Sequence, residues 1–441
     1  MQSFCVKLVA AASLFTSFAS AGFQKDSRNN VAVYWGQNFA SGSQQRLSSY
    51  CGSSKLDIIP IAFLTSLTDP TINLANAGNN CTTFPGSQLM NCPQLEEDIK
   101  TCQSKHGKTV MLSIGGETYQ EGGFPSASAA KAAAQTVWDL FGPNTKTANR
   151  PFGSAVVDGF DFDFESKTQN MVPFAQHLRE LMDASSKKSK TPYYLSAAPQ
   201  CPFPDVADGE MLAGEVAFDF IMVQFYNNYC GVQNFVAQGG RQGGGSARRQ
   251  QAAFNFAAWD AWASGKTLDG SRGSKNPDVK ILLGVPASKS AASIGFVEAE
   301  LLRPIVDFCA SNFKSFGGVM MWDMSHLFSA GGGSGSPVVG SFLEEVHGAL
   351  SLASSTLLKG THRVNDVNAT ASATRQQQPG QGSSDAAKNN SSSINDSANG
   401  GGGSAPLSSA STSYYLSSVA VSWPGLVLGV LVHYSLGSIL S

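Results

Sequence analysis

The chain has 441 residues, only 14% of them charged, and its formal net charge is −2. This balance gives no support for nucleic-acid binding or for attachment to a membrane by charge. The length could accommodate two or three domains, but the composition favours one large domain with low-complexity extensions.

The first 21 residues have the pattern of a secretory signal peptide. Lys7 supplies a positive charge, an apolar stretch runs from Leu8 to Phe18, and Ala19-Ser20-Ala21 fits a cleavage site. We therefore expect residues 1–21 to be removed and the mature protein to be secreted.

Eight short runs of apolar and β-branched residues follow. They are Val31–Trp35, Ile58–Leu64, Thr109–Ile114, Val156–Phe164, Tyr193–Ala198, Phe218–Phe225, Val279–Val285 and Gly317–Trp322. Between most of them lie helix-compatible stretches: Leu95–Cys102, Ala129–Phe141, Val172–Ala184, Gln250–Trp262 and Val297–Phe308. This alternation predicts an α/β fold with a parallel sheet, and eight strands favour a closed (β/α)8 TIM barrel over residues 22–350.

The fourth run carries three carboxylates at alternate positions, Asp161, Asp163 and Glu165, separated by phenylalanines. In a strand the three acids share one face, and like charges this close raise one another's pKa. A protonated acid beside an ionised one is what glycoside cleavage needs. The alternative is an amphipathic edge strand with a solvated acidic face, but the phenylalanines make its other face too apolar for that.

The pattern Asp-x-x-Asp-x-Asp-x-Glu, formed with Asp158, resembles the signature of glycoside hydrolase family 18, the chitinases. Further segments resemble the plant-type (class III) members, and the resemblance covers about residues 29 to 345. These segments are Val31–Asn38, Ser113–Gly116, Ala197–Asp205, Gln224–Asn228 and Gly317–Trp322. The resemblance, which extends to fungal endochitinases with a glycosylphosphatidylinositol (GPI) anchor, implies hydrolysis of β-1,4-linked N-acetylglucosamine polymers in a TIM barrel.

Glu165 ends the acidic row, where the strand stops, and we interpret it as the general acid. The resemblance implies that the substrate's own N-acetyl carbonyl is the nucleophile, so that the configuration is retained. It also implies that Asp163 stabilises the acetamido nitrogen, that Asp161 hydrogen-bonds Asp163, and that Tyr226 donates to the acetamido oxygen.

Four further residues are expected to contact the sugar: Tyr34, Gln224, Asn227 and Trp322. Trp322 ends the last run, where its ring can stack under the sugar, although a core tryptophan that closes the barrel is the alternative. The alternative for Asn227 and Gln224 is that each serves as a structural cap and does not contact the sugar. Asp158 is an even number of positions from the phenylalanines, so in a strand it lies on their face. We therefore expect it to face outward and to have a structural role.

Seven cysteines remain once Cys5 leaves with the signal peptide, and spacing alone leaves 15 pairings open for any six of them. The resemblance implies the bridges Cys51–Cys102, Cys81–Cys92 and Cys201–Cys230. Cys309 then remains in an apolar run as a buried thiol. The cysteine and histidine spacings predict no metal site, and no cofactor is expected.

Low-complexity segments occupy two parts of the chain. Residues 238–246 hold too much glycine for a helix and predict a mobile surface loop. Residues 351–413 are dominated by Ser, Thr, Asn, Gln and Gly, which predicts a disordered, glycosylated stalk. Acceptor sequons occur at Asn80, Asn368, Asn389, Asn390 and Asn395.

Residues 414–441 turn apolar, and no Lys or Arg follows Lys388. Small residues, a polar spacer and an apolar tail predict a GPI-attachment signal that is removed, in preference to a membrane-spanning helix. The sequence therefore predicts a monomeric endochitinase that is secreted and GPI-anchored to the plasma membrane at the cell surface or cell wall. Its expected partners are chitin or N-acetylglucosamine oligomers. Two alternatives stay open: an endo-β-N-acetylglucosaminidase acting on N-glycan cores, and an inactive lectin or inhibitor.

Overall fold

The computed structural model describes residues 22–40, 44–237, 251, 253–266, 272–329 and 342–354. The expected signal peptide, glycine-rich loop, stalk (apart from residues 351–354) and apolar tail lie outside these ranges. None of the described helices combines the length and the apolar character that crossing a membrane requires.

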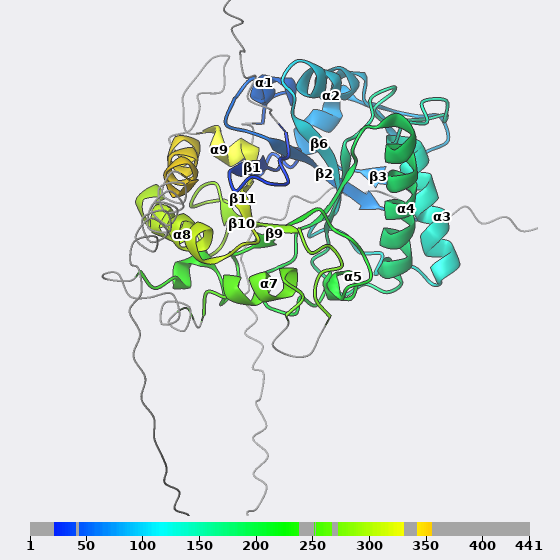
Figure 1. Cartoon of the computed structure of the whole chain (residues 1–441). Helices are drawn as coiled ribbons and strands as arrows, with labels where there is room; N and C mark the ends of the chain where they lie inside the picture. The colour runs from blue at the N-terminus through cyan, green and yellow to red at the C-terminus, as the bar shows by residue number, and fades with distance from the viewer. Residues whose placement is uncertain are drawn as a thin grey trace, which may run out of the picture. The chain divides into compact units, whose positions relative to one another are not determined.

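Eight parallel strands form a closed barrel (Figure 1). They are β1 (Asn30–Val33), β2 (Ile58–Ser66), β6 (Thr109–Gly115), β7 (Gly159–Asp163), β8 (Tyr194–Ala197), β9 (Phe220–Gln224), β10 (Lys280–Pro286) and β11 (Phe316–Trp322). The ring closes because β1 pairs with both β11 and β2, in the registers Val31↔Val319 and Ala32↔Ile58. Each strand coincides with one of the eight predicted runs, so the TIM-barrel prediction is confirmed.

Helices surround the barrel (Figure 1). The five longer named helices overlap the five predicted stretches: α2 (Pro93–Ser104), α3 (Ala127–Phe141), α4 (Met171–Ser189), α7 (Phe256–Ala263) and α8 (Ala299–Asn312). The single-turn helices α1 (Ser48–Cys51), α5 (Gly209–Leu212) and α9 (Met324–Leu327) were not predicted, because four residues carry no apolar period. Residues 342–354 are also helical.

The connection between β2 and α2 holds the irregular part of the fold. Strand β3 (Thr71–Ile72) pairs antiparallel with β2, and β4 (Thr82–Thr83) forms a hairpin with β5 (Met90–Asn91). The structure contains the three expected bridges, Cys51–Cys102, Cys81–Cys92 and Cys201–Cys230. Cys309 is buried in α8 with a free thiol.

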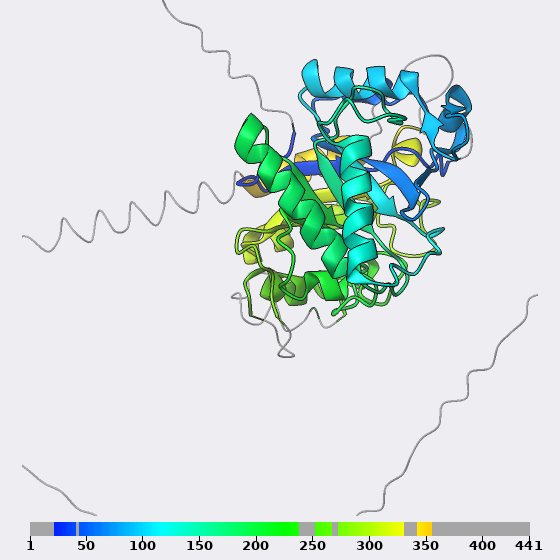
Figure 2. The same ribbon diagram turned by 90° about the vertical axis from the view of Figure 1, so that its right-hand side faces the viewer.

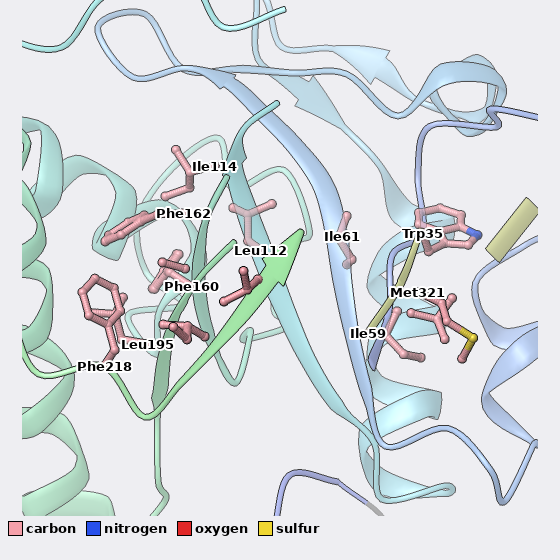
Figure 3. Close-up of a cluster of buried hydrophobic side chains, with 14 of the residues drawn as sticks. Trp35, Ile59, Ile61, Leu112, Ile114, Phe160, Phe162, Leu195, Phe218 and Met321 are labelled. Carbon is pink, nitrogen blue, oxygen red and sulfur yellow. The ribbon is translucent and has the colours of Figure 1, made fainter. Parts of the chain in front are cut away.

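The main hydrophobic core lies between the strands and the helices. Figure 2 shows α3 and α4 side by side against the barrel, and Figure 3 shows Phe160, Phe162 and Phe218 gathered in this layer. The ring of Phe162 lies 5.9 Å from Phe174 of α4. Complete burial of such a side chain contributes about 1.5–3 kcal/mol. This packing fixes the outer face of β7 and leaves its inner face for polar residues.

Candidate active site

Strand β7 divides its side chains as the alternation predicted. Phe160 and Phe162 are fully buried in the outer layer, whereas Asp161 and Asp163 belong to the inner face with 0% and 4% exposure. Glu165 lies two residues beyond Asp163, past the end of the strand, and is exposed. One strand therefore delivers a buried, a nearly buried and an accessible carboxyl group in a single row.

A cavity of about 530 Å³ adjoins this row and opens at the carboxyl ends of the strands. Asp163, Glu165, Gln224, Tyr226 and Trp322 line it. Phe63 of β2 also lines it, and its remaining lining residues come from the loops that follow β1, β6, β8, β9 and β10: Gln37, Phe39, Glu117, Thr118, Gln200, Asn227, Asn228 and Ser290–Ser293. The structure thus brings most of the predicted site residues to one cavity.

Asp161 is held by three hydroxyl groups inside the barrel. Tyr34 Oη and Ser113 Oγ donate to its Oδ2 at 2.7 Å each, and Ser196 Oγ donates to its Oδ1 at 2.6 Å. Burial raises the pKa of Asp161, and these three donors oppose the shift. The expected hydrogen bond between Asp161 and Asp163 is not formed among the described residues, because both oxygens of Asp161 accept from hydroxyls.

Asp163 is bonded to Gln224 instead. The Gln224 side-chain nitrogen donates to Asp163 Oδ1 at 2.8 Å and to the carbonyl of Ala198 at 3.0 Å. Burial, followed by the nearby charges of Glu165 and Asp161, holds the pKa of Asp163 well above its usual range. Gln224 therefore positions a carboxyl group, a role that differs from the expected contact with sugar alone.

Glu165 has the properties of a proton donor. Its pKa is raised chiefly by desolvation of the carboxyl group at the cavity wall and secondly by the charge of Glu117, while the amide of Gln224 acts in the opposite direction. A carboxylic acid whose pKa is raised and that faces a cavity is suited to protonate a departing oxygen.

Tyr226 and Trp322 complete the walls. Tyr226 is 7% exposed, and burial together with Asp163 and Glu165 holds the pKa of its hydroxyl well above 10, so it remains a donor. The ring of Trp322 stacks on Phe63 at 5.8 Å with an interplanar angle of 18°, and Phe39 meets it edge-on at 6.1 Å. This aromatic platform beside the acids suits the apolar face of a sugar ring.

One expected sugar contact, Tyr34, is corrected, and another, Asn227, is found to have a structural role as well. Tyr34 is 1% exposed and does not line the cavity, because its hydroxyl is directed to Asp161. Asn227 does line the cavity, but its side-chain oxygen accepts from the backbone nitrogens of Ser293 and Ile294 at 2.9 and 3.2 Å. Asn227 thus braces the loop after β10, and its expected contact with sugar stays a prediction.

Asp158 lies outside the site, as its parity predicted. Its Oδ2 accepts from the Val110 backbone nitrogen at 2.7 Å and from the Gln103 side chain at 2.9 Å. Burial raises its pKa to about 6. It ties β7 to β6 and α2, so the first acid of the signature secures the strand that carries the others.

Two glycines allow β6 to approach the acidic strand. Gly115 has φ +119°, and a Cβ there would lie 2.4 Å from the Asp163 carbonyl oxygen. Gly116 has φ +81°, and a Cβ there would lie 2.7 Å from the Phe63 ring. The Gly116 nitrogen donates to the Asp163 carbonyl at 2.7 Å, so the glycine pair fixes the position of the acids.

Some residues around the acids were not predicted to take part. Ser113 and Ser196 hold Asp161, and barrel register was the signal that could have found them, since both pair with Asp161 across the sheet. Asp208 is fully buried, both its oxygens lack a hydrogen-bond partner among the described residues, and burial, followed by Asp205, raises its pKa well above normal. No sequence pattern marks it. Within the described ranges, no cluster of three His, Cys, Asp or Glu residues is arranged to hold a metal ion.

Comparison with known proteins places this site in a family. Residues 30–298 match the family Glycosyl hydrolases family 18. A protein named class III chitinase from Arthroderma benhamiae is 47% identical over 349 residues, which cover 77% of this chain and 91% of that protein. Endochitinase 33 of Trichoderma harzianum is 45% identical, with coverage of 73% and 95%.

A solved structure with the same fold has a different description. The xylanase and alpha-amylase inhibitor protein XAIP-II from Scadoxus multiflorus has 28% identity and a TM-score of 0.52, with coverage of 73% of this chain and 98% of that one. The family match and the identities leave no doubt about kinship: this chain belongs to glycosyl hydrolase family 18.

Proposed function

We propose that this protein is an endochitinase that cleaves β-1,4-linked N-acetylglucosamine polymers with retention of configuration. The observation that carries the proposal is the shared cavity of Glu165, Asp163 and Tyr226, with Trp322 as an aromatic wall. The names of the two fungal relatives support chitin as the substrate.

The proposed reaction begins with the proton of Glu165, which passes to the glycosidic oxygen as the bond from that oxygen to the anomeric carbon breaks. The carbonyl oxygen of the substrate's own acetamido group bonds to the same carbon and forms an oxazolinium ion. Asp163 accepts a hydrogen bond from the acetamido nitrogen and stabilises its positive charge, and Tyr226 donates to the acetamido oxygen. For this, Asp163 exchanges its bond with Gln224 for one with the substrate.

Hydrolysis of the oxazolinium ion completes the cycle. Glu165, now a carboxylate, takes a proton from a water molecule whose oxygen attacks the anomeric carbon from the face that the leaving group occupied. Glu165 regains its proton, the acetamido group is released, and the product keeps the original configuration. Family 18 is among the families in which the substrate replaces the second carboxylate.

A thiazoline mimic of the oxazolinium ion tests this route. We expect competitive inhibition with an affinity at least about 100-fold above that of the matching oligomer, because transition-state mimics gain from interactions that the substrate makes only during reaction. The measurement is inhibition of chitin-oligomer hydrolysis by the purified protein. NMR of the first product formed should show the β-anomer. Initial release of the α-anomer, or no binding of the thiazoline, would contradict the mechanism.

The same purified protein can be used to test the two alternative functions. An enzyme specific for N-glycan cores would release glycans from N-glycopeptides and leave chitin oligomers intact. An inactive inhibitor, the description of the Scadoxus multiflorus neighbour, would cleave neither. The presence of Glu165, Asp163 and Tyr226 in one cavity favours catalysis over inhibition.

We also propose secretion as a monomer and GPI anchoring at the cell surface. The support for secretion and anchoring is the composition of residues 1–21, the polar residues 351–413 and the apolar residues 414–441. Removing residues 411–441 should release active enzyme into the medium, and a phosphatidylinositol-specific phospholipase should release the anchored protein from intact cells. The measurement is hydrolytic activity in the supernatant. Peptides from Leu426 to Ser441 in the mature protein, detected by mass spectrometry, would instead show that the tail is retained.

A further inference from the structure

Glu117 is a cavity carboxylate that the acidic signature does not include. It follows the Gly115–Gly116 pair at the end of β6, while Glu165 follows the end of β7. The two strands are parallel neighbours, and Gly115 pairs with Asp163. Glu117 and Glu165 therefore each lie two residues beyond the same paired position, at the mouth of adjacent strands about 4.8 Å apart.

Both carboxyl groups open to the same space. Glu117 and Glu165 line the cavity, and each is exposed. No lysine or arginine is found among the described residues that line it, and Glu117 has no ion-pair partner within the described chain. The described lining of the cavity thus places no cation between the charge of Glu117 and Glu165.

We propose that Glu117 is a positioning residue that acts through Glu165: its negative charge holds the catalytic proton on Glu165 as the pH rises. This inference rests on the proposed role of Glu165 as general acid. The charge of Glu117 is the second contribution, after burial, to the raised pKa of Glu165. The reaction thereby keeps its acid in the protonated form that it requires.

Other titratable groups also surround Glu165. Asp163 lies beside it on β7, Tyr226 follows β9, and Asp208 precedes α5; each is electrostatically coupled to Glu165. Asp163 and Tyr226 take part in the proposed chemistry, and Asp208 is fully buried. Glu117 is the member of this set that is solvent-exposed and has no other assigned role, so its charge can be removed selectively.

The test is the pH dependence of kcat/KM for Glu117→Gln. Removing a like charge lowers the pKa of Glu165, so the alkaline limb, where Glu165 loses its proton, should move to lower pH. We expect the rate on that limb to fall about three- to tenfold relative to wild type, while the acidic plateau stays within about twofold. Salt should weaken the difference, because both groups face solvent. Glu117→Asp should restore most of the wild-type profile.

Glu180→Gln is the matched control, because Glu180 is an exposed residue of α4 outside the cavity. It changes the net charge equally and should leave the profile in place. An unshifted alkaline limb in Glu117→Gln would overturn the proposal. A rise in KM alone would also overturn it, since that result would make Glu117 a contact for sugar.

Carboxyl NMR separates this inference from the proposed function. In protein labelled with ¹³C at glutamate side chains, the Glu165 signal is identified by its loss in Glu165→Gln. Its titration midpoint should move to lower pH in Glu117→Gln whether or not chitin is the substrate. If the wild type is active and the Glu165 midpoint in Glu117→Gln equals that of the wild type, the role of Glu117 is refuted. If the wild type does not hydrolyse chitin but the Glu165 midpoint is lower in Glu117→Gln, only the proposed function is refuted.

Discussion

Glu165→Gln should abolish hydrolysis of chitin oligomers while the protein still folds and binds them. Glutamine keeps the shape of the side chain but has no acidic proton to give to the departing oxygen. Loss of a general acid lowers kcat by about 100- to 10,000-fold. The effect belongs at the upper end of that range here, because a sugar alkoxide leaves poorly without a proton. Steady-state kinetics with a reducing-end-labelled oligomer measures it.

Binding and folding controls give this result its meaning. Calorimetry with the same oligomer should show a dissociation constant within about threefold of wild type, and the thermal transition should be unchanged, because Glu165 is exposed to the cavity and not packed in the core. Glu180→Gln on α4 is the matched variant with full activity. A Glu165→Gln enzyme with one third of the wild-type rate would exclude Glu165 as the acid.

Asp163→Asn should reduce kcat by about 100- to 1,000-fold with little change in KM. The proposed reaction places positive charge on the acetamido nitrogen, and removal of one preorganised electrostatic partner costs a loss of this size. The asparagine keeps the volume and still reaches Gln224. The contrast between kcat and KM on chitin oligomers is the measurement, and Asp183→Asn on the exposed face of α4 is the control.

Thermal stability and thiazoline affinity distinguish this role of Asp163 from a structural one. A merely structural Asp163 would lower the melting temperature and leave kcat of the remaining folded enzyme close to wild type. A thiazoline should also bind Asp163→Asn more weakly, because its ring nitrogen loses the same partner. Unchanged thiazoline affinity would show that Asp163 does not face the acetamido group.

The barrel and its acidic row were predictable because both follow from local patterns. Alternating Phe160, Asp161 and Phe162 specify a strand with two different faces, and eight such apolar runs specify the number of strands. The cysteine pairing was implied by resemblance and not by spacing, which left many pairings open. The single-turn helices and the β4–β5 hairpin carry too few residues to show a period.

The errors at the site share one cause. Position in a motif indicates that Tyr34 and Asp161 belong to the site, but it does not show which donor and which acceptor form each hydrogen bond. The barrel brings Tyr34, which directly follows β1, Ser113 of β6 and Ser196 of β8 to the same carboxylate, so both oxygens of Asp161 accept from hydroxyl groups. Glu117 was missed for the same reason, since its relation to Glu165 exists only across two paired strands.

The two occupied faces of β7 have a consequence for how this protein tolerates change. Phe160 and Phe162 fill the layer beneath the helices, Asp161 and Asp163 face the interior, and a Cβ on Gly159 would lie 1.9 Å from the Tyr194 carbonyl. No side chain of the strand faces bulk water, so substitutions there damage either packing or chemistry. We therefore expect exposed positions of the surrounding loops and helices to tolerate substitution better than any position of β7.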